Sequence, residues 1–181
     1  MTIICALHDP ETRSTWIGSD RRAVDNGTKV DVGPKWTLSD GWAVGHAGNL
    51  RAANLLQANA DDLFHDLDGP LTFTNRVRSI LEADGFNKDS AEGPGCWGQQ
   101  MILATADSVW SIGITLEFYV IEAGEFWADG SGRSFALGAA FAHHGDAEHK
   151  VHAALMAAIT YETGCGGEPW IHELTADADH K

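Results

Sequence analysis

The sequence lacks the features of several protein classes. Its three cysteines, Cys5, Cys96 and Cys165, are odd in number and do not have the spacing of metal ligands, so they indicate reduced thiols rather than a disulfide framework or a zinc site. No apolar run approaches the ~20 residues of a membrane-spanning helix. The first residues show no basic stretch followed by an apolar segment, as a secretory signal would. We therefore expect a soluble, cytoplasmic protein.

Cationic residues are also scarce. The chain has 12 Lys and Arg against 26 Asp and Glu, a formal net charge of −14, which argues against nucleic acid or an anionic membrane as the main partner. Histidines gather at His143, His144, His149 and His152, but no carboxylate or cysteine spacing completes a metal site around them. A solvated polar helix face explains them better, and we predict no metal and no cofactor.

The length and patterning predict one domain over residues 1–181, because 181 residues suffice for a substantial core and no repeat or linker interrupts them. Apolar runs with strand character cover residues 3–7, 15–19, 35–38, 42–46, 100–104, 109–114, 118–122, 126–128 and 170–174. Helical spacing of apolar residues covers 50–63, a stretch opened by Pro70 and reaching Leu81, then 135–143 and 146–161. This order predicts an α+β fold with two antiparallel sheets between helical layers.

Turn signals separate these elements. Asp40-Gly41 is a two-residue hairpin signal between two strands, and Asn26-Gly27 marks a loop after the second strand. Residues 87–98 are rich in glycine and charge and contain Pro94, which predicts a mobile loop. The polar residues 175–181 are expected to fray.

A threonine directly follows the initiator methionine, and removal of Met1 would expose it as a free N-terminal residue. An N-terminal threonine carries its own base, because the α-amine titrates near ~8 and can accept the hydroxyl proton. Taken alone this is weak evidence, since small second residues are common wherever methionine is removed. If Met1 is retained, Thr2 has an amide in place of the amine and the base is lost.

Three further stretches supply the chemistry that such a threonine needs. An apolar strand ends at Asp20, Lys35 opens the next apolar run, and Ala47-Gly48-Asn49 stands where a helical pattern begins. A buried Lys35 near Thr2 would favour the alkoxide and keep the amine neutral, while Asp20 would orient the lysine. The backbone N–H of Gly48 would stabilise a tetrahedral oxyanion.

With these residues the chain resembles the proteasome β-subunit family, in particular the small bacterial HslV-type peptidases, from Thr2 to about Leu174. The resemblance implies a four-layer αββα sandwich of the N-terminal nucleophile (Ntn) hydrolase type. Thr2 matches the family's catalytic threonine, Asp20 its acidic residue and Lys35 its lysine. Ala47-Gly48-Asn49 matches the turn that supplies the oxyanion N–H.

Later motifs extend the resemblance. Gly130-Ser131-Gly132 matches a family turn whose serine, here Ser131, supports the amine. Glu162-Thr163-Gly164-Cys165-Gly166-Gly167 matches a late Asp-x-x-Ser-Gly-Gly turn, with Glu162 in place of Asp and Cys165 in place of Ser, so the hydrogen bonding around the amine is altered. Arg22 stands two positions after Asp20, as in many β-subunits, whereas HslV-type enzymes have a different residue there.

Each of these residues also has a non-functional explanation. Asp20, Arg21 and Arg22 could form a surface ion cluster, and Lys35 could be a solvated lysine whose burial would decide the matter. Gly48 could serve only the turn, Ser131 could cap the following helix, and Cys165 could be an inert buried thiol. Their combination favours function.

The sequence therefore predicts a threonine peptidase that hydrolyses peptide or unfolded protein substrates. Thr2, Asp20, Lys35, Gly48 and Ser131 would be catalytic and Arg22, Glu162 and Cys165 supporting. The resemblance further implies a homo-oligomeric ring and allows an ATP-dependent unfoldase as partner. Two alternatives stay open: an inactive ring-forming or interaction protein that retains Met1, and an Ntn hydrolase of small-molecule amides.

Overall fold

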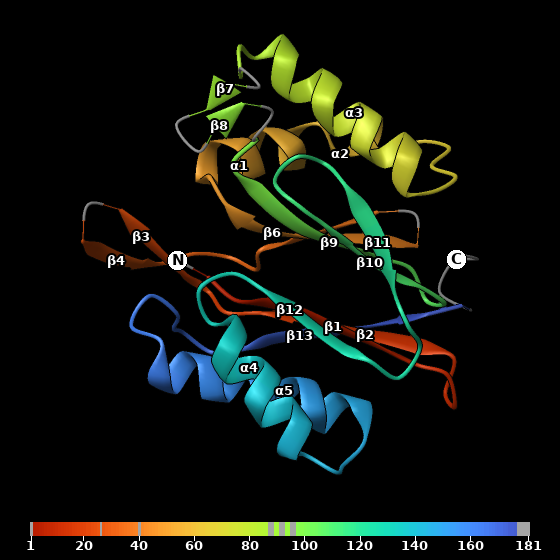
Figure 1. The fold of residues 1–181 in the computed structure, drawn as a ribbon, viewed down its shortest axis with the longest axis vertical. Coiled ribbons are helices and arrows are strands. Elements are labelled where there is room, and N and C mark those ends of the chain that lie inside the picture. Colours follow the sequence, from red (N-terminus) through yellow and green to blue (C-terminus); the bar gives the residue numbers. More distant parts are fainter. Residues whose placement is uncertain are drawn as a thin grey trace.

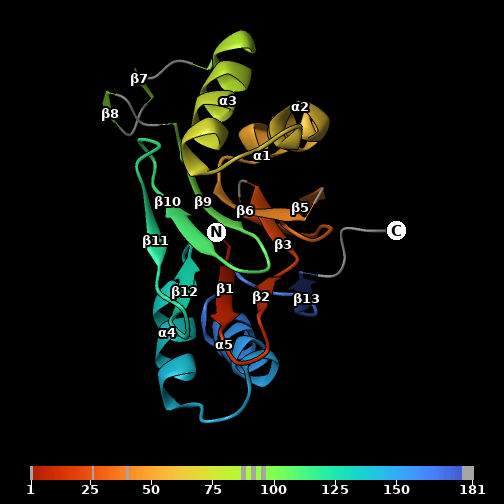
Figure 2. The same ribbon diagram turned by 90° about the vertical axis from the view of Figure 1, so that its right-hand side faces the viewer.

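The computed structural model describes residues 2–25, 27–39, 41–86, 89–90, 93–94 and 97–176. Figure 1 shows four stacked layers, with helices above and below two sheets, and Figure 2 shows the same layers from the side. The predicted α+β sandwich of two antiparallel sheets between helical layers is confirmed.

The first sheet has the strand order β12 (Phe126–Asp129), β1 (Ile4–Asp9), β2 (Ser14–Ser19) and β13 (Trp170–Thr175), all antiparallel. Its central strand β1 begins with the run Ile-Cys-Ala-Leu, in which every residue is buried. A strand covered on both faces needs such an unbroken apolar run instead of alternation. The run that opens the sequence therefore forms a strand in the middle of the protein.

The second sheet has the order β11 (Phe118–Ile121), β10 (Val109–Ile112), β9 (Gln99–Ala104), β6 (Trp42–Gly48) and β5 (Trp36–Ser39). Ser39 pairs with Trp42, so β5 and β6 form the predicted hairpin. Gly41 has φ +75°, the left-handed conformation that such turns require and glycine adopts readily. Asp40 lies outside the described residues.

Helices cover the outer face of each sheet. The second sheet is covered by α1 (Leu50–Ala58), α2 (Ala60–Phe64) and α3 (Pro70–Ala83), and the first by α4 (Arg133–Ala142) and α5 (Ala147–Tyr161). Asn49 begins α1, because its side chain accepts from the N–H groups of Arg51 and Ala52. Pro70 occupies the first turn of α3, as predicted, where its missing N–H costs no hydrogen bond.

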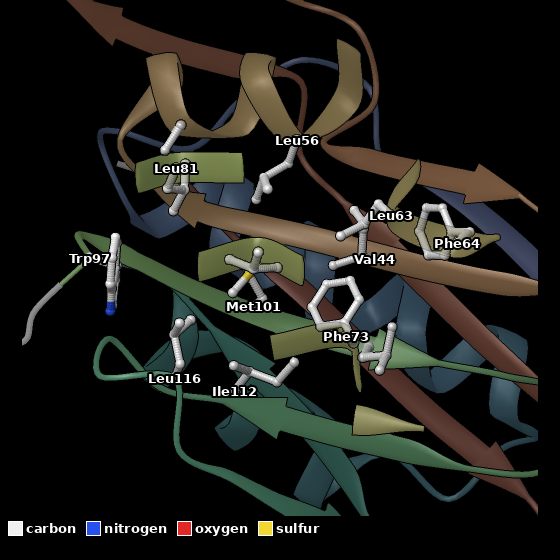
Figure 3. Close-up of a cluster of buried hydrophobic side chains, with 13 residues drawn as sticks. Val44, Leu56, Leu63, Phe64, Phe73, Leu81, Trp97, Met101, Ile112 and Leu116 are labelled. Carbon is white, nitrogen blue, oxygen red and sulfur yellow. The ribbon is translucent and has the colours of Figure 1, made fainter. Parts of the chain in front are cut away.

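Three apolar clusters join the four layers. One lies between α1–α3 and the second sheet and includes Val44, Phe73 and Met101 (Figure 3). A second lies between the two sheets, and a third between the first sheet and α4–α5. Residues of β1 alternate between the last two clusters, with Ile4 facing the other sheet and Cys5 facing the helices.

Four details differ from the sequence predictions. The predicted helical stretch 50–63 forms two helices, α1 and α2, that meet at Asn59. The segment after Asp20 forms a hairpin of β3 (Arg22–Asp25) and β4 (Thr28–Asp31) rather than only a loop. The predicted loop 87–98 contains two short paired strands, β7 (Asp89–Ser90) and β8 (Gly93–Pro94); its other residues up to Cys96 lie outside the described ones. The predicted frayed tail begins too early, because Thr175 pairs with Ser14 in β13; residues 177–181 are not described.

None of the described helices combines the length and apolar character of a membrane span. The described residues likewise contain no group of three or more His, Cys, Asp or Glu side chains placed to hold a metal ion.

Candidate active site

Asp20 is the centre of a buried polar cluster just beyond the end of β2. Its side chain is 0% exposed. One carboxylate oxygen accepts from the Thr2 hydroxyl at 3.0 Å and from the Ile3 N–H at 3.0 Å, and the other accepts from the N–H groups of Arg22 at 3.2 Å and Gly166 at 3.1 Å. Such a carboxylate is no surface ion, because a buried charge persists only when it is paired and fully hydrogen-bonded.

Lys35 completes the pairing of Asp20. Its ammonium donates to Asp20 Oδ1 at 2.5 Å, to the Arg22 carbonyl at 2.6 Å and to the Thr2 hydroxyl oxygen. An ammonium has three N–H groups, so each has a partner. The side chain is only 12% exposed, which excludes the solvated lysine. Burial lowers its pKa, whereas the Asp20 carboxylate acts in the opposite direction.

Thr2 lies two residues before the start of β1, and its hydroxyl contacts both of these charged groups. Its hydroxyl donates to Asp20 and accepts from Lys35, so the oxygen lies beside a cation that would stabilise it as an alkoxide. The Thr2 main-chain nitrogen donates to Ser131 Oγ at 3.2 Å. Ser131 belongs to the loop between β12 and α4; Gly132 is the N-cap of α4, and no side chain caps this helix. Ser131 therefore contacts the N-terminal segment and is not a helix cap.

The loop around Ser131 approaches Thr2 closely. Gly130 has φ +100°, and a Cβ atom there would lie 2.4 Å from the Thr2 carbonyl oxygen. That oxygen accepts from the Gly132 N–H at 3.2 Å. Only glycine fits this contact, because any side chain would push the loop from the strand.

Gly48 is the last residue of β6 and precedes the N-cap of α1. It has φ +140°, and a Cβ atom would lie 2.1 Å from the Gly98 carbonyl oxygen, so the turn alone demands glycine. Nearby, the His46 N–H donates to the Lys35 carbonyl at 3.0 Å, which places this end of β6 beside Lys35. Gly48 makes no hydrogen bond to Thr2 in the described part of the chain, and its function as oxyanion donor stays a prediction.

The three predicted supporting residues, Arg22, Glu162 and Cys165, contact different parts of the site. Arg22 donates from Nη1 to the Cys165 carbonyl at 3.1 Å and lies 3.6 Å from Asp31, so it ties the β3–β4 hairpin to the late glycine turn. Burial, followed by the Asp20 charge, raises the pKa of Cys165 to about 12, while the Ser131 hydroxyl acts in the opposite direction. Glu162 accepts from the Gly164 N–H at 3.2 Å and thus shapes the turn without contacting Thr2.

Several residues to which the sequence analysis gave no function of their own also position the site, among them Gly166 of the late glycine turn. Gly166 donates to Asp20, and Ser19 Oγ accepts from the Lys35 main-chain N–H at 3.2 Å. Gln99 is fully buried and donates to the Asn49 carbonyl, next to Gly48. Gln99 is the first residue of β9 and is followed by a second glutamine, so nothing in the sequence marks it as buried.

A cavity of about 600 Å³ adjoins the cluster at Lys35. It lies between β5, the end of β6 and α1, and its lining includes Lys35, Trp36, His46, Leu50 and Ala53. A larger cavity, of about 720 Å³, lies along α4 and shares no residue with the cluster. The smaller cavity is therefore the one that a molecule bound at Thr2 could enter.

Comparison with known proteins supports the fold. No protein-family model and no curated protein matches the sequence. A structure of Thiobacillus denitrificans BPH matches over 98% of this chain and 100% of its own, with a TM-score of 0.80 and 17% identity. The same protein in complex with epoxomicin matches over 96% and 98%, with a TM-score of 0.79 and 18% identity. Eukaryotic HslV from Trypanosoma brucei matches over 96% and 99%, with a TM-score of 0.69 and 20% identity.

These likenesses establish the fold class. The chain has the HslV-like Ntn-hydrolase fold, as the sequence resemblance predicted. At 17–20% identity they establish the fold alone, so the chemistry has to be argued from the site.

Proposed function

We propose that this protein is a threonine peptidase of the Ntn-hydrolase type, active after removal of Met1. The observation that carries this proposal is the Thr2 hydroxyl, which lies between the Lys35 ammonium and the Asp20 carboxylate in a buried site. A threonine needed only for packing would have no use for two buried charges, which are costly to remove from water.

Removal of Met1 converts the Thr2 main-chain nitrogen into a primary amine beside Ser131 Oγ. The amine, held neutral by the nearby Lys35 charge, accepts the hydroxyl proton directly or through one water. The Thr2 oxygen attacks the carbonyl carbon of a peptide bond, and the Gly48 N–H and Lys35 stabilise the developing negative charges.

Collapse of the tetrahedral intermediate breaks the peptide C–N bond. The proton held by the Thr2 amine passes to the leaving amine, and the acyl group stays on the threonine as an ester. Water, deprotonated by the same amine, then attacks the ester and restores the hydroxyl. Asp20 stays ionised throughout and orients Lys35.

Intact-mass spectrometry with the epoxyketone epoxomicin tests the nucleophile, because the reagent closes a ring only with a free N-terminal amine and its neighbouring hydroxyl. We expect loss of Met1 and a single adduct in the wild-type protein. The adduct should vanish in Thr2→Ala and persist in Thr28→Ala, a matched change at an exposed threonine of β4. Retained Met1 with no adduct would contradict the proposal and favour the inactive ring-forming protein.

The substrate and the assembly are part of the same proposal. The structural relatives favour a homo-oligomeric ring that encloses the sites, acting on peptides or unfolded proteins with or without an ATP-dependent unfoldase. Light scattering coupled to size exclusion should give several times the monomer mass of 19.5 kDa. A monomer that forms the adduct and cleaves small amides but no peptides would instead identify a small-molecule amide hydrolase.

A further inference from the structure

The cavity beside Lys35 contains a buried histidine that the proposed chemistry does not use. His46 is 6% exposed and lines the cavity together with Val32, Pro34, Leu38 and Leu50. Along β6, Val44 belongs to the cluster beneath the helices (Figure 3), and His46, two residues later, points to the same face of the sheet. Its ring therefore faces the α1 side, where the cavity opens.

Neither ring nitrogen of His46 makes a hydrogen bond within the described structure. A buried polar group without a partner is costly, and nearly all such groups in folded proteins have one. Burial lowers the pKa of His46 to about 4, so at neutral pH the ring is uncharged and offers one N–H donor and one acceptor nitrogen. A ligand that satisfies both ring nitrogens must therefore offer one hydrogen-bond acceptor and one hydrogen-bond donor.

Lys35 does not change this requirement although it also lines the cavity. Its three N–H groups already donate to Thr2, Asp20 and the Arg22 carbonyl. Lys35 therefore has no free N–H to neutralise a ligand carboxylate, which would also have to approach the buried Asp20. The other described residues that line the cavity are apolar or, as Trp36, Thr37, Asn54 and Gln57, polar but uncharged. They offer hydrogen bonds but no counterion, so they favour a neutral polar ligand group over a charged one.

We propose that the cavity selects substrates with a primary-amide side chain, glutamine or asparagine, on the residue whose carbonyl is attacked, and that His46 is the residue that reads the amide. Lys35 links the two sites, because it donates to the Thr2 hydroxyl and lines the cavity. A side chain next to the attacked carbonyl can therefore reach the cavity. This inference rests on the proposed peptidase function.

Peptides with a fluorogenic leaving amide test the preference. They differ only in the last residue: Gln, its charged isostere Glu, or apolar Leu. We expect kcat/KM for Gln to exceed that for Leu and for Glu by at least about tenfold, since a site built to hydrogen-bond rejects analogues that leave it unpaired. In His46→Leu the preference should reverse in favour of Leu, whereas the exposed His152→Leu on α5 should keep the wild-type order.

A preference for Leu or Glu in the wild-type protein, or an unchanged Gln preference in His46→Leu, would overturn the inference. A second measurement needs no turnover, so failure of the peptidase function is distinguishable from failure of the pocket assignment. In ¹⁵N-histidine-labelled Thr2→Ala protein, N-acetyl peptides ending in Gln should shift the His46 ring resonances, and those ending in Leu should shift them at least about fivefold less. Equal shifts, or none with Gln, would refute the pocket assignment even if epoxomicin labels the wild-type protein.

Discussion

Lys35 adjoins two buried polar centres, one around Asp20 and one around His46, and they differ in how many of their polar atoms have hydrogen-bond partners. Around Asp20 both carboxylate oxygens accept from several donors, and every N–H of the Lys35 ammonium is engaged. Around His46 both ring nitrogens are unpartnered. The first centre is complete without a ligand, as a preorganised electrostatic device should be. The second is incomplete, as a recognition site is before its ligand arrives.

The largest expected effect comes from breaking the complete centre. Asp20→Asn would leave the Lys35 ammonium buried without a counterion and would place an amide N–H₂ among donors, so we expect a loss of about 3–5 kcal/mol in the free energy of unfolding. Urea denaturation measures it. Asp129→Asn is the matched control.

Asp129 is also a buried carboxylate, 3% exposed, but among the described residues its side chain accepts only from the Ser111 and Trp127 side chains, and burial raises its pKa. Its charged form is already disfavoured, so a neutral amide there should cost less than about 1 kcal/mol. Equal losses in the free energy of unfolding for the two variants would show that the Asp20 charge contributes no more to stability than the Asp129 carboxyl group does.

Adding Lys35→Met to Asp20→Asn should remove the unpaired buried ammonium and leave the protein folded. It should lower kcat below that of Asp20→Asn by about 10²–10³-fold, the effect of losing one preorganised charge at the reacting oxygen. Steady-state kinetics with the preferred peptide measures it. A loss below about tenfold would mean that Lys35 is structural.

The pH dependence of kcat in the wild-type protein tests the same role of Lys35. In the proposed mechanism activity requires protonated Lys35, so activity is kept below the lysine pKa and lost as the pH rises through it. Because burial lowers this pKa, kcat should decline below the ordinary lysine value of ~10.4. The Thr2 amine must be neutral, which gives a rise near or below ~8 on the acidic side. A profile without an alkaline decline up to pH 10.4 would contradict the role of Lys35.

Changing His46, unlike changing Asp20, should raise the free energy of unfolding. His46→Leu removes a buried ring with no hydrogen-bond partner, so we expect a gain of about 1 kcal/mol in the free energy of unfolding and a higher melting temperature. The exposed His152→Leu should stay within about 0.5 kcal/mol of wild type. A loss above about 1 kcal/mol in His46→Leu would mean that the ring is already satisfied, for example by ordered water.

The smallest effect is expected at Cys165. Its thiol is neutral because burial raises the pKa to about 12, and a thiol is a weaker hydrogen-bond donor than a hydroxyl. Cys165→Ser should therefore change kcat by at most about fivefold, or about 1 kcal/mol, with KM unchanged. Single-turnover kinetics measures it, and a fall beyond tenfold would identify the sulfur itself as necessary.

Strand and helix order was predictable because each element carries a local signal. The apolar run before Leu7, the Asp40-Gly41 turn and the proline that opens α3 depend on residues close in sequence. The β3–β4 hairpin was missed because its strands are short and β4 is exposed on all four residues, so no apolar pattern indicates them. The prediction that the frayed tail begins at residue 175 was wrong for a related reason, since Thr175 belongs to β13 through its pairing with the distant Ser14.

The sequence by itself determined which chemical groups the site contains, because Thr2, Asp20, Lys35 and Ser131 were identifiable from their positions at strand ends and turns and from the family resemblance. Only the tertiary structure decided that Lys35 is buried, that the Gly166 N–H reaches Asp20 and that His46 faces a cavity without a partner. These properties depend on contacts between residues far apart in the chain. Burial and hydrogen-bond satisfaction arise only when the sheets and helices pack together.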